Sequence, residues 1–303
     1  MTRGGTMGAL LDVLRQSISP CMQIWRRYIW HFLILYVVLL GVVLLTLVSK
    51  LNGENPVSVR EKIHSPYDPL PLTISKALVL AKVREENVSW VDDLQPQWIP
   101  YIYTADREPG YFPVPENKGR EGMAYLTHII DNYDTLTDIT VFMHASATQW
   151  HNDVGDTNSS NVLSMLRLDA VKQRGYVNLR CQHRPGCPTA VHPFDPELLS
   201  SPSIVYRNFT TIYTELFNTS IETVPKEIGG VCCGQFALTK ERIHQRRRED
   251  YVHMRDWAFS TSLDNFTVGS VFEMLWHMVF LEDPVSCPDT QQCYCELYDL
   301  CNE

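Results

Sequence analysis

One long apolar stretch dominates the pattern of hydrophobic and polar positions near the beginning of the chain. Residues 28–49, YIWHFLILYVVLLGVVLLTLVS, contain no Lys, Arg, Asp or Glu. About 20 such residues cross the hydrocarbon core of a bilayer as a helix. We therefore predict a transmembrane helix at residues 29–48, so a membrane is one expected partner.

The charges that flank this stretch predict its orientation. Arg15, Arg26 and Arg27 precede it, whereas Lys50 is the nearby cation that follows it. The positive-inside rule then makes residues 1–28 a cytosolic tail and residues 29–48 the signal-anchor of a type II single-pass protein. A cleaved signal peptide is the alternative, but the apolar run exceeds an h-region of about 7–15 residues.

Proline marks the segment that follows. Residues 49–76 contain Pro56, Pro66, Pro69 and Pro71 and show little apolar periodicity. This composition is typical of an extended, semi-rigid stem. Residues 77–303 follow as one domain, which the predicted orientation places in the lumen of the Golgi or the ER, or outside the cell.

Short apolar runs alternate with helical patterns through this domain. Four runs are typical of buried strands: 77–83, 99–105, 140–145 and 231–238. Helical patterns are found around Trp90–Leu94 and at 121–133, 161–172, 204–217, 249–263 and 268–280. Strand, helix and strand at this spacing predict βαβ units. The predicted fold is α/β, with a mostly parallel central sheet flanked by helices and a helical, disulfide-rich C-terminal section.

Charge and cysteine content limit the classes of function. The net charge is −9, and a binder of nucleic acid would carry a basic face, so no nucleic-acid partner is expected. Of nine cysteines, Cys21 precedes the apolar stretch and an even eight follow it, as an oxidising compartment favours. Five N-x-S/T sequons also follow it and predict a glycoprotein: Asn87, Asn158, Asn208, Asn218 and Asn265.

The eight cysteines can pair in many ways, and their positions favour one arrangement. Cys181 and Cys187 flank a Pro-Gly turn, so we expect them to be bridged. We expect Cys232 and Cys233 each to be tied to the C-terminal tail, because a bridge between adjacent residues would be strained. The tail cysteines are Cys287, Cys293, Cys295 and Cys301. A zinc site formed by these four is the alternative.

Several motifs resemble a known family. The segments that carry the resemblance are NKGREGMAYLTHIIDNYDTL (117–136), VFMHASATQWHND (141–153), RGYVNLRC (174–181), CCGQFALTKERI (232–243), VFEMLWHMVF (271–280) and CPDTQQCYCELYDLC (287–301). In these segments the chain resembles fungal membrane-anchored proteins that are catalogued only as a domain of unknown function.

Four further features form a second pattern: an opening strand, an N-x-G-R-E segment before a helix, a G-x-F-x-x-T-K segment at 234–240 and an acidic residue on a late helix. In this pattern the chain more distantly resembles glycosyltransferases of the type-A fold. The resemblance implies a nucleotide sugar as donor, a glycan or small molecule as acceptor, and a divalent cation. The Asp-x-Asp motif that usually holds this cation is absent from the chain.

The segment Asn117, Lys118, Gly119, Arg120 and Glu121 precedes a predicted helix. A helix N-terminus with two basic side chains can hold a diphosphate, so we predict that the first four residues bind the donor. Alternatively, Asn117 and Glu121 cap the helix and the basic pair is solvated.

His144, His151 and Asp153 follow the strand at 140–145, where the Asp-x-Asp motif would be. Imidazole and carboxylate ligands suit Mn²⁺ or Zn²⁺, so these three residues are the predicted metal ligands. The alternative is a turn at residues 150–153 that hydrogen-bonds its own backbone.

Glu273 and His277 lie four residues apart on a predicted helix and share a face. Apolar neighbours would raise the pKa of Glu273 towards use as a general base, so both are predicted catalytic residues. The alternative is a buried pair with His277 or Arg255 that stabilises the helix.

These observations lead to three hypotheses. The first is a type II membrane glycosyltransferase-like enzyme that uses a nucleotide sugar. The second is a non-catalytic lumenal binding or maturation factor, and the third is a fungal natural-product tailoring enzyme of other chemistry. The missing Asp-x-Asp motif favours the second, whereas the polar residues Asn117, Arg120, His144 and His151 favour an enzyme.

Overall fold

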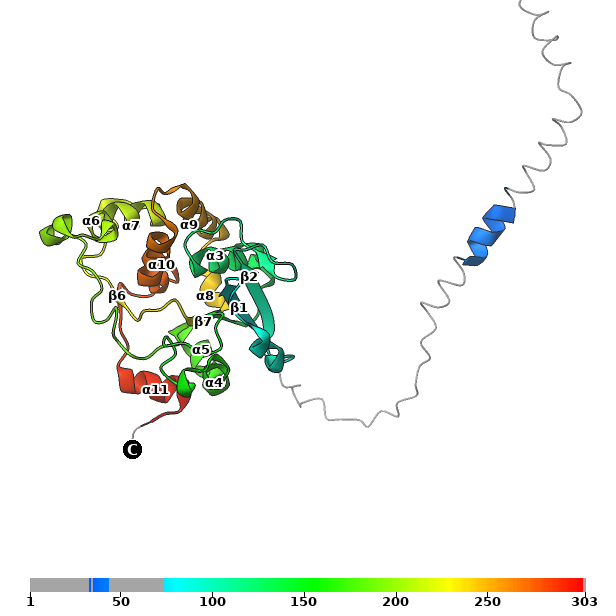
Figure 1. Cartoon of the computed structure of the whole chain (residues 1–303), viewed down its shortest axis with the longest axis horizontal. Helices are drawn as coiled ribbons and strands as arrows, with labels where there is room; N and C mark the ends of the chain where they lie inside the picture. Colours follow the sequence, from blue (N-terminus) through cyan, green and yellow to red (C-terminus); the bar gives the residue numbers. More distant parts are fainter. Residues whose placement is uncertain (1–32, 34, 44–73, 302–303) are drawn as a thin grey trace, which may run out of the picture. The chain divides into compact units, whose positions relative to one another are not determined.

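The structure is a computed structural model, and it describes residue 33, residues 35–43 and residues 74–301. Residues 33 and 35–43 are helical, and no helix within the described ranges is long and apolar enough to cross a membrane. The tail, most of the predicted signal-anchor and most of the stem lie outside these ranges and stay predictions. Residues 74–301 belong to one compact unit (Figure 1).

A six-stranded mixed sheet forms the centre of residues 74–301. Its strand order is β3-β2-β1-β4-β7-β5. The strands are β1 (Lys76–Lys82), β2 (Ile99–Thr104), β3 (Phe112–Pro113), β4 (Ile139–His144), β5 (Tyr176–Asn178) and β7 (Phe236–Thr239). A separate short sheet pairs β6 (Gly229–Gly230) with β8 (Val285–Ser286).

Parallel pairing prevails in the larger sheet. β1 pairs in parallel with β2 and with β4, and β2 pairs in parallel with β3. β7 runs antiparallel to both of its neighbours, β4 and β5. Three of the five pairings in this sheet are therefore parallel, so the sheet is mixed. The predicted α/β class with a central sheet flanked by helices is confirmed.

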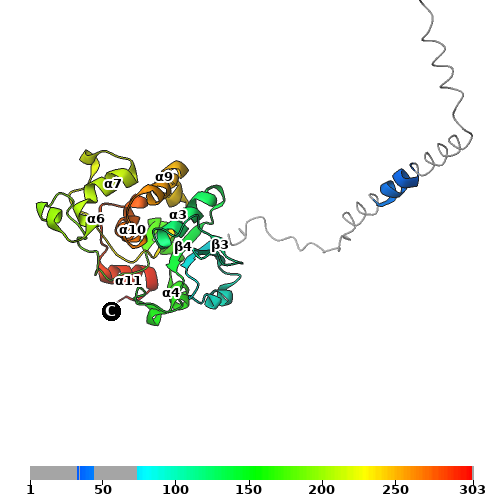
Figure 2. The ribbon, with the colours of Figure 1, turned by 45° about the horizontal axis from the view of Figure 1, so that its top comes forward.

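Apolar side chains alternate along the strands and supply a core to each face of the sheet. Val79, Phe142 and Phe236 point into one core, which packs against α3 (Glu121–Asp131), α7 (Phe209–Phe217), α9 (Arg248–Ser260) and α10 (Asn265–Val279). Leu78, Val141 and Ala237 point into the other core, which packs against α4 (Ser159–Met165), α5 (Leu168–Arg174) and α11 (Thr290–Tyr298). Figure 2 shows these two helix groups on opposite sides of the domain.

The helices have the following bounds. The α-helices are α3 (Glu121–Asp131), α4 (Ser159–Met165), α5 (Leu168–Arg174), α6 (Ile204–Arg207), α7 (Phe209–Phe217), α8 (Lys240–His244), α9 (Arg248–Ser260), α10 (Asn265–Val279) and α11 (Thr290–Tyr298). The 3-10 helices are η1 (Ser89–Leu94), η2 (Tyr133–Thr135), η3 (Gly155–Thr157), η4 (Pro196–Ser200) and η5 (Ile221–Thr223).

The sequence predicted β1, β2, β4 and α3 to within two residues, but three later elements differ. The helix expected at 161–172 is broken into α4 and α5, because Leu166 is extended (ψ 119°). The helix expected at 204–217 is broken into α6 and α7 at Asn208. The strand expected at 231–238 begins only at Phe236, because Cys233 and Gly234 turn the chain with positive φ.

The predicted cysteine pairing is wrong. Within the described domain the bridges are Cys181–Cys293, Cys187–Cys287, Cys232–Cys233 and Cys295–Cys301. The fold brings the end of β5 and the loop after it against the tail, so Cys181 and Cys187 are tied to the tail rather than to each other. The adjacent pair, which the sequence analysis rejected, is bridged. All four tail cysteines are engaged in bridges, which excludes the alternative zinc site.

Candidate functional site

The candidate site lies at the carboxyl ends of β1, β2 and β4. The chain passes from β1 to β2 and β3 on one side and returns to β4 on the other side of β1. Open α/β sheets bind ligands outside the carboxyl ends of the strands at such a switch of direction. A cleft of about 460 Å³ is found there, lined by the ends of these strands and by the start of α3.

One wall of this cleft is the turn into α3. Gly119 has φ +81°, and a Cβ added to it would lie 3.0 Å from Cγ1 of Val268 on α10. The backbone N–H of Arg120 donates to Oδ1 of Asn265 at 2.9 Å, and the amide of Asn265 donates to Oδ1 of Asn117 at 3.2 Å. Asn117, Arg120 and Asn265 all line the cleft, so this turn is fixed by contacts with α10.

Two basic residues of the turn have different surroundings. The guanidinium of Arg120 lies 4.3 Å from the ring centroid of Phe266 and is exposed at the cleft. The ammonium of Lys118 instead donates to the carbonyl of Phe259 at 3.1 Å and to that of Thr261. Lys118 thus ties the turn to the end of α9, and Arg120 is the basic group that faces the cleft.

Two histidines form the wall opposite this turn. The rings of His144, at the end of β4, and His151 lie 4.5 Å apart and line the cleft. Nε2 of His144 lies 3.0 Å from the carbonyl oxygen of Cys233. Burial, with smaller effects of His144 and Arg180, lowers the pKa of His151 to about 4, so this ring is neutral at physiological pH.

Asp153 is not part of this histidine pair. Its Oδ2 accepts hydrogen bonds from the backbone N–H of Cys181 and of Gln182, both at 2.8 Å, and from the hydroxyl of Tyr294 at 3.1 Å. The predicted metal ligands His144, His151 and Asp153 do not come close enough together to form one site, and Oδ2 of Asp153 instead holds the segment after β5. Among the described residues, the group of three His, Cys, Asp or Glu side chains that does come close together is Cys232, Cys233 and Glu273. Its two cysteines are joined in a disulfide, so they offer no thiolate to a metal.

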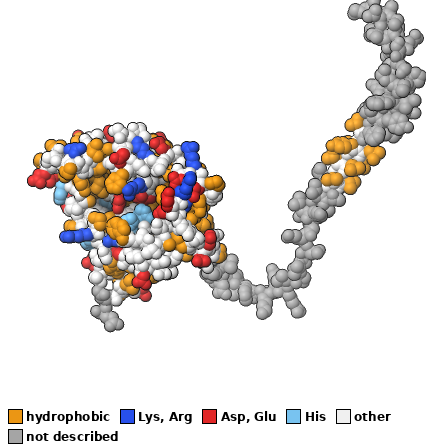
Figure 3. All heavy atoms as spheres, in the orientation of Figure 1, with side chains coloured by type: hydrophobic (Ala, Val, Ile, Leu, Met, Phe, Trp, Pro, Cys, Tyr) orange, Lys and Arg blue, Asp and Glu red, His pale blue; other side chains and the backbone are white. Residues whose placement is uncertain are grey.

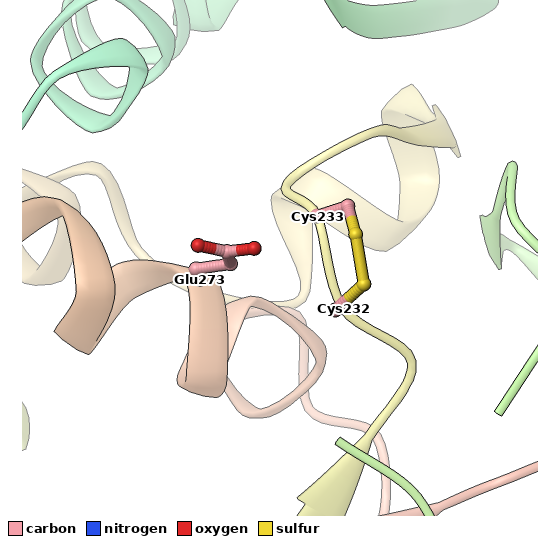
Figure 4. Close-up of side chains that lie close together, drawn as sticks. All are labelled: Cys232, Cys233 and Glu273. Atoms are coloured by element: carbon pink, nitrogen blue, oxygen red, sulfur yellow. A yellow bond between two sulfur atoms is a disulfide. The ribbon is translucent and has the colours of Figure 1, made fainter. Parts of the chain in front are cut away.

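Glu273 lies on α10 beside the Cys232–Cys233 bridge, and Figure 4 shows that its carboxylate faces this loop. Burial raises the pKa of Glu273, and the negative charge of Glu121 raises it further. His144, a hydrogen bond from the Cys233 backbone and Arg120 act in the opposite direction. The carboxylate thus lies within electrostatic reach of Arg120 and His144, on the same side of the sheet as the cleft.

His277 has a different environment from Glu273, although both lie on α10. Its buried ring hydrogen-bonds the carbonyl of Pro284 at 3.1 Å and packs closely against Gly230. Burial lowers the pKa of His277. These contacts join α10 to the short β6–β8 sheet, and the catalytic roles predicted for His277 and Glu273 stay predictions.

Sequence reasoning missed Gln235 at the site and two unpartnered polar groups in the core. The hydroxyl of Tyr125 and Nε1 of Trp276 are buried and have no hydrogen-bond partner among the described residues. Burial raises the pKa of Tyr125, and the charges of Glu121 and Glu86 raise it further. Gln235 accepts hydrogen bonds from the backbone of His144 and the amide of Gln149. The two aromatic residues follow the apolar pattern of core helices, and no motif distinguishes them.

The five sequons fall on differently exposed residues. Asn87, Asn208, Asn218 and Asn265 are exposed, whereas Asn158 is half-buried and caps α4 through Ser160 and Asn161. Glycosylation stays a prediction at all five. At Asn265 an attached glycan would stand at the edge of the cleft, because this residue lines it.

The resulting arrangement has an arginine at one wall, two histidines at another and two carboxylates near the loop at residues 232–234. In comparisons with known proteins, a family model described as "Protein of unknown function (DUF3431)" matches residues 78–296. No curated protein and no solved structure matches the chain.

Proposed function

This chain belongs to the DUF3431 family, whose description assigns no function, and we propose from its site that it is a glycosyltransferase-like enzyme. It would transfer a sugar from a nucleotide sugar to a hydroxyl group. The observation that carries this proposal is that Glu273, a half-buried carboxylate of raised pKa, lies within electrostatic reach of Arg120 and His144, which line the cleft at the carboxyl edge of the parallel strands.

Arg120 suits the diphosphate of the donor. Its guanidinium lies over the ring of Phe266, and its side chain passes Gly269, where an added Cβ would meet it at 3.0 Å. A guanidinium held in this way can make two parallel hydrogen bonds to phosphate oxygens. The cleft of about 460 Å³ is within the range of small-molecule sites, roughly 300–1,000 Å³.

Glu273 suits the role of general base. Its raised pKa brings it closer to the pH at which proton transfer is most effective. In the transfer step the acceptor hydroxyl gives its proton to Glu273 while its oxygen bonds to the anomeric carbon of the sugar. The bond between that carbon and the diphosphate oxygen breaks, and the nucleoside diphosphate leaves with both electrons of the bond.

The divalent cation that the resemblance implies has no matching set of ligands at the predicted residues. The set His144, His151 and Asp153 does not fit it, because Asp153 is bonded to the backbone after β5 and to Tyr294. We therefore derive no step through a metal. The proposed donor site requires Asn117 and Arg120, which line the cleft.

The predicted type II topology would place this domain in the secretory pathway, where nucleotide sugars and acceptors meet. The test is release of nucleoside diphosphate from a panel of nucleotide sugars by the full-length protein, with and without added Mn²⁺. Donor-dependent release that Glu273→Gln abolishes supports the proposal. The absence of release from every donor, with and without metal, would refute it.

The second candidate is a non-catalytic lumenal binding factor. It is favoured by the absence of an Asp-x-Asp motif from the sequence and by the unassembled metal set. In that case the nucleotide would bind with an affinity that depends on Arg120, but no diphosphate would be released. Binding and release assays on the same preparation therefore separate the two candidates.

A further inference from the structure

A second and larger cavity lies on the other side of Glu273. It has a volume of about 640 Å³ and is enclosed by α6, the first half of α10, the loop around Pro185–Ala190 and the segment Gly230–Cys232. None of these segments, apart from α10, contributes to the cleft at the ends of the strands. The domain thus offers two separate places for two reactants.

Glu273 connects the two places. The residue lines the second cavity, while its pKa responds to Arg120, His144 and Glu121, which line the first. The stacked pair of Arg120 and Phe266 stands on the same boundary, since Arg120 lines the cleft and Phe266 lines the cavity. A base at this position can act on a hydroxyl held in the cavity while the donor occupies the cleft.

The lining of the cavity is mostly apolar. Ile204, Val205, Phe266 and Met274 contribute hydrophobic surface, and Phe266 remains 60 % exposed. Large apolar side chains exposed at the rim of a cavity are typical of ligand-binding sites. The Cys232–Cys233 bridge adds further apolar surface opposite α10 (Figure 4).

The polar side chains of the lining are five hydroxyls and one carboxylate. Within the described domain the hydroxyls come from Thr189, Ser203, Tyr206, Thr267 and Ser270, and the carboxylate comes from Glu273. The hydroxyls of Ser270 and Thr189 are already donated, to the carbonyl of Phe266 at 3.1 Å and to Glu227. An oligosaccharide carries more hydroxyls than the remaining groups can pair, so its burial here would cost hydrogen bonds to water. An apolar ring that carries one hydroxyl would gain from burial.

We propose that this cavity is the acceptor subsite and that its ligand is a compact apolar alcohol or phenol, oriented with its hydroxyl towards Glu273. The term acceptor rests on the proposed function. The cavity's chemistry and its place beside Glu273 rest on the geometry alone.

The test uses the full-length protein and 4-methylumbelliferone, a fluorescent phenol, with cellobiose as the polar comparison. Ser270→Phe fills the cavity from α10, and Ala190→Phe fills it from the opposite loop. Ser260→Phe is the matched control, because Ser260 is also a helical serine bonded to its own helix but lies on α9 outside the cavity. UDP binding is measured in each variant to check that the separate donor cleft is intact.

We expect 4-methylumbelliferone to bind and cellobiose not to compete. Either filling variant should weaken the binding of 4-methylumbelliferone by about tenfold or more, equivalent to ~1.4 kcal/mol in binding free energy. Ser260→Phe should bind it as the native protein does, and UDP binding should be unchanged throughout. If Ser270→Phe does not fold, the loss of phenol binding is tested with Ala190→Phe alone.

Three results would overturn the inference: no binding of the phenol, equal binding in the filled variants, or tighter binding of cellobiose. Failure of the proposed function has a different signature. The native protein would then bind the phenol and the filled variants would not. No nucleotide sugar would be consumed when the phenol is present. That result would remove the term acceptor and retain a site for apolar alcohols.

Discussion

Glu121, the first residue of α3, lies close enough to Glu273 of α10 that its negative charge raises the pKa of Glu273. The two helices meet here because Gly122 packs against the ring of Phe272, where an added Cβ would approach to 2.8 Å. The turn at Gly234 lies beside the pair, since a Cβ built there would be 3.2 Å from Oε1 of Glu121. Two carboxylates held together in a partly buried site favour protonation of one of them.

Glu273→Gln tests the catalytic role of this pair. The substitution is nearly isosteric, so the fold should be retained while turnover falls by the ~10²–10⁴ expected for loss of a general base. The measurement is the initial rate of nucleoside diphosphate release. Glu282→Gln is the control, because burial also raises the pKa of Glu282 but its partner is Arg242, at 3.2 Å, away from the cleft. Turnover that survives Glu273→Gln would exclude Glu273 as the base.

Glu273→Gln should lower turnover but raise the stability of the folded protein at neutral pH. Because the folded protein raises the pKa of Glu273, the folded state binds more protons than the unfolded state between the two pKa values. The stability that Glu273 contributes is therefore complete below its unfolded pKa and is lost as the pH rises through the folded pKa. Glu273→Gln should make the protein more stable than the native form at neutral pH, but not at low pH. Urea unfolding at the two pH values measures this.

The framework of the site could be predicted from the sequence because its signals are local. The apolar runs of β1 and β4 and the spacing within α3 placed the ends of these elements within two residues. The position of Arg120 and His144 at one edge of the sheet follows from those elements. Glu273 could be proposed as a base because its apolar helical neighbours already indicated desolvation.

The rest depends on contacts between distant segments. The structural role of the Asp153 carboxylate could not be predicted, because its partner Tyr294 lies on α11, 141 residues further along the sequence. The cysteine pairs likewise depend on the position of the tail against β5. The cavity beyond Glu273 has no motif, because α6 and the loop at 185–190 enclose it only in the folded chain.

Arg120→Ala and Lys118→Ala separate two adjacent basic residues. Arg120 faces the cleft, so its loss should weaken nucleoside diphosphate binding by roughly tenfold or more, as expected for a charge-assisted contact. Lys118 instead donates to carbonyls at the end of α9. Its loss should leave binding unchanged but lower the free energy of unfolding by about 1–3 kcal/mol. Titration calorimetry and urea unfolding measure the two effects, and the reverse pattern would assign the diphosphate to Lys118.

The disulfides should differ in their contribution to stability because they close loops of different length. Cys181–Cys293 spans 112 residues and Cys295–Cys301 spans 6. Because Cys187–Cys287 lies inside the first loop and stays intact, the ring that the first bridge closes runs through both bridges and holds roughly 12 residues. The loop-entropy relation then gives about 3 kcal/mol for the first bridge and about 2 kcal/mol for the second. We expect the double serine variant of the long bridge to lose more unfolding free energy, as measured in urea. Peptide mapping of the native protein is the accompanying control, and recovery of a Cys181–Cys187 peptide would contradict the observed pairing.

Asp153→Ala distinguishes a structural carboxylate from a metal ligand. The substitution removes the acceptor of two backbone N–H groups and of the Tyr294 hydroxyl. The free energy of unfolding should fall by about 1.5–3 kcal/mol or more, since hydrogen bonds to charged groups contribute that much each. Asp92→Ala, at an exposed position on η1, should have little effect. If diphosphate release responds to added Mn²⁺, the concentration for half-maximal response should be the same in the variant and the native protein. A large rise in that concentration without loss of stability would return Asp153 to the metal site that the sequence predicted.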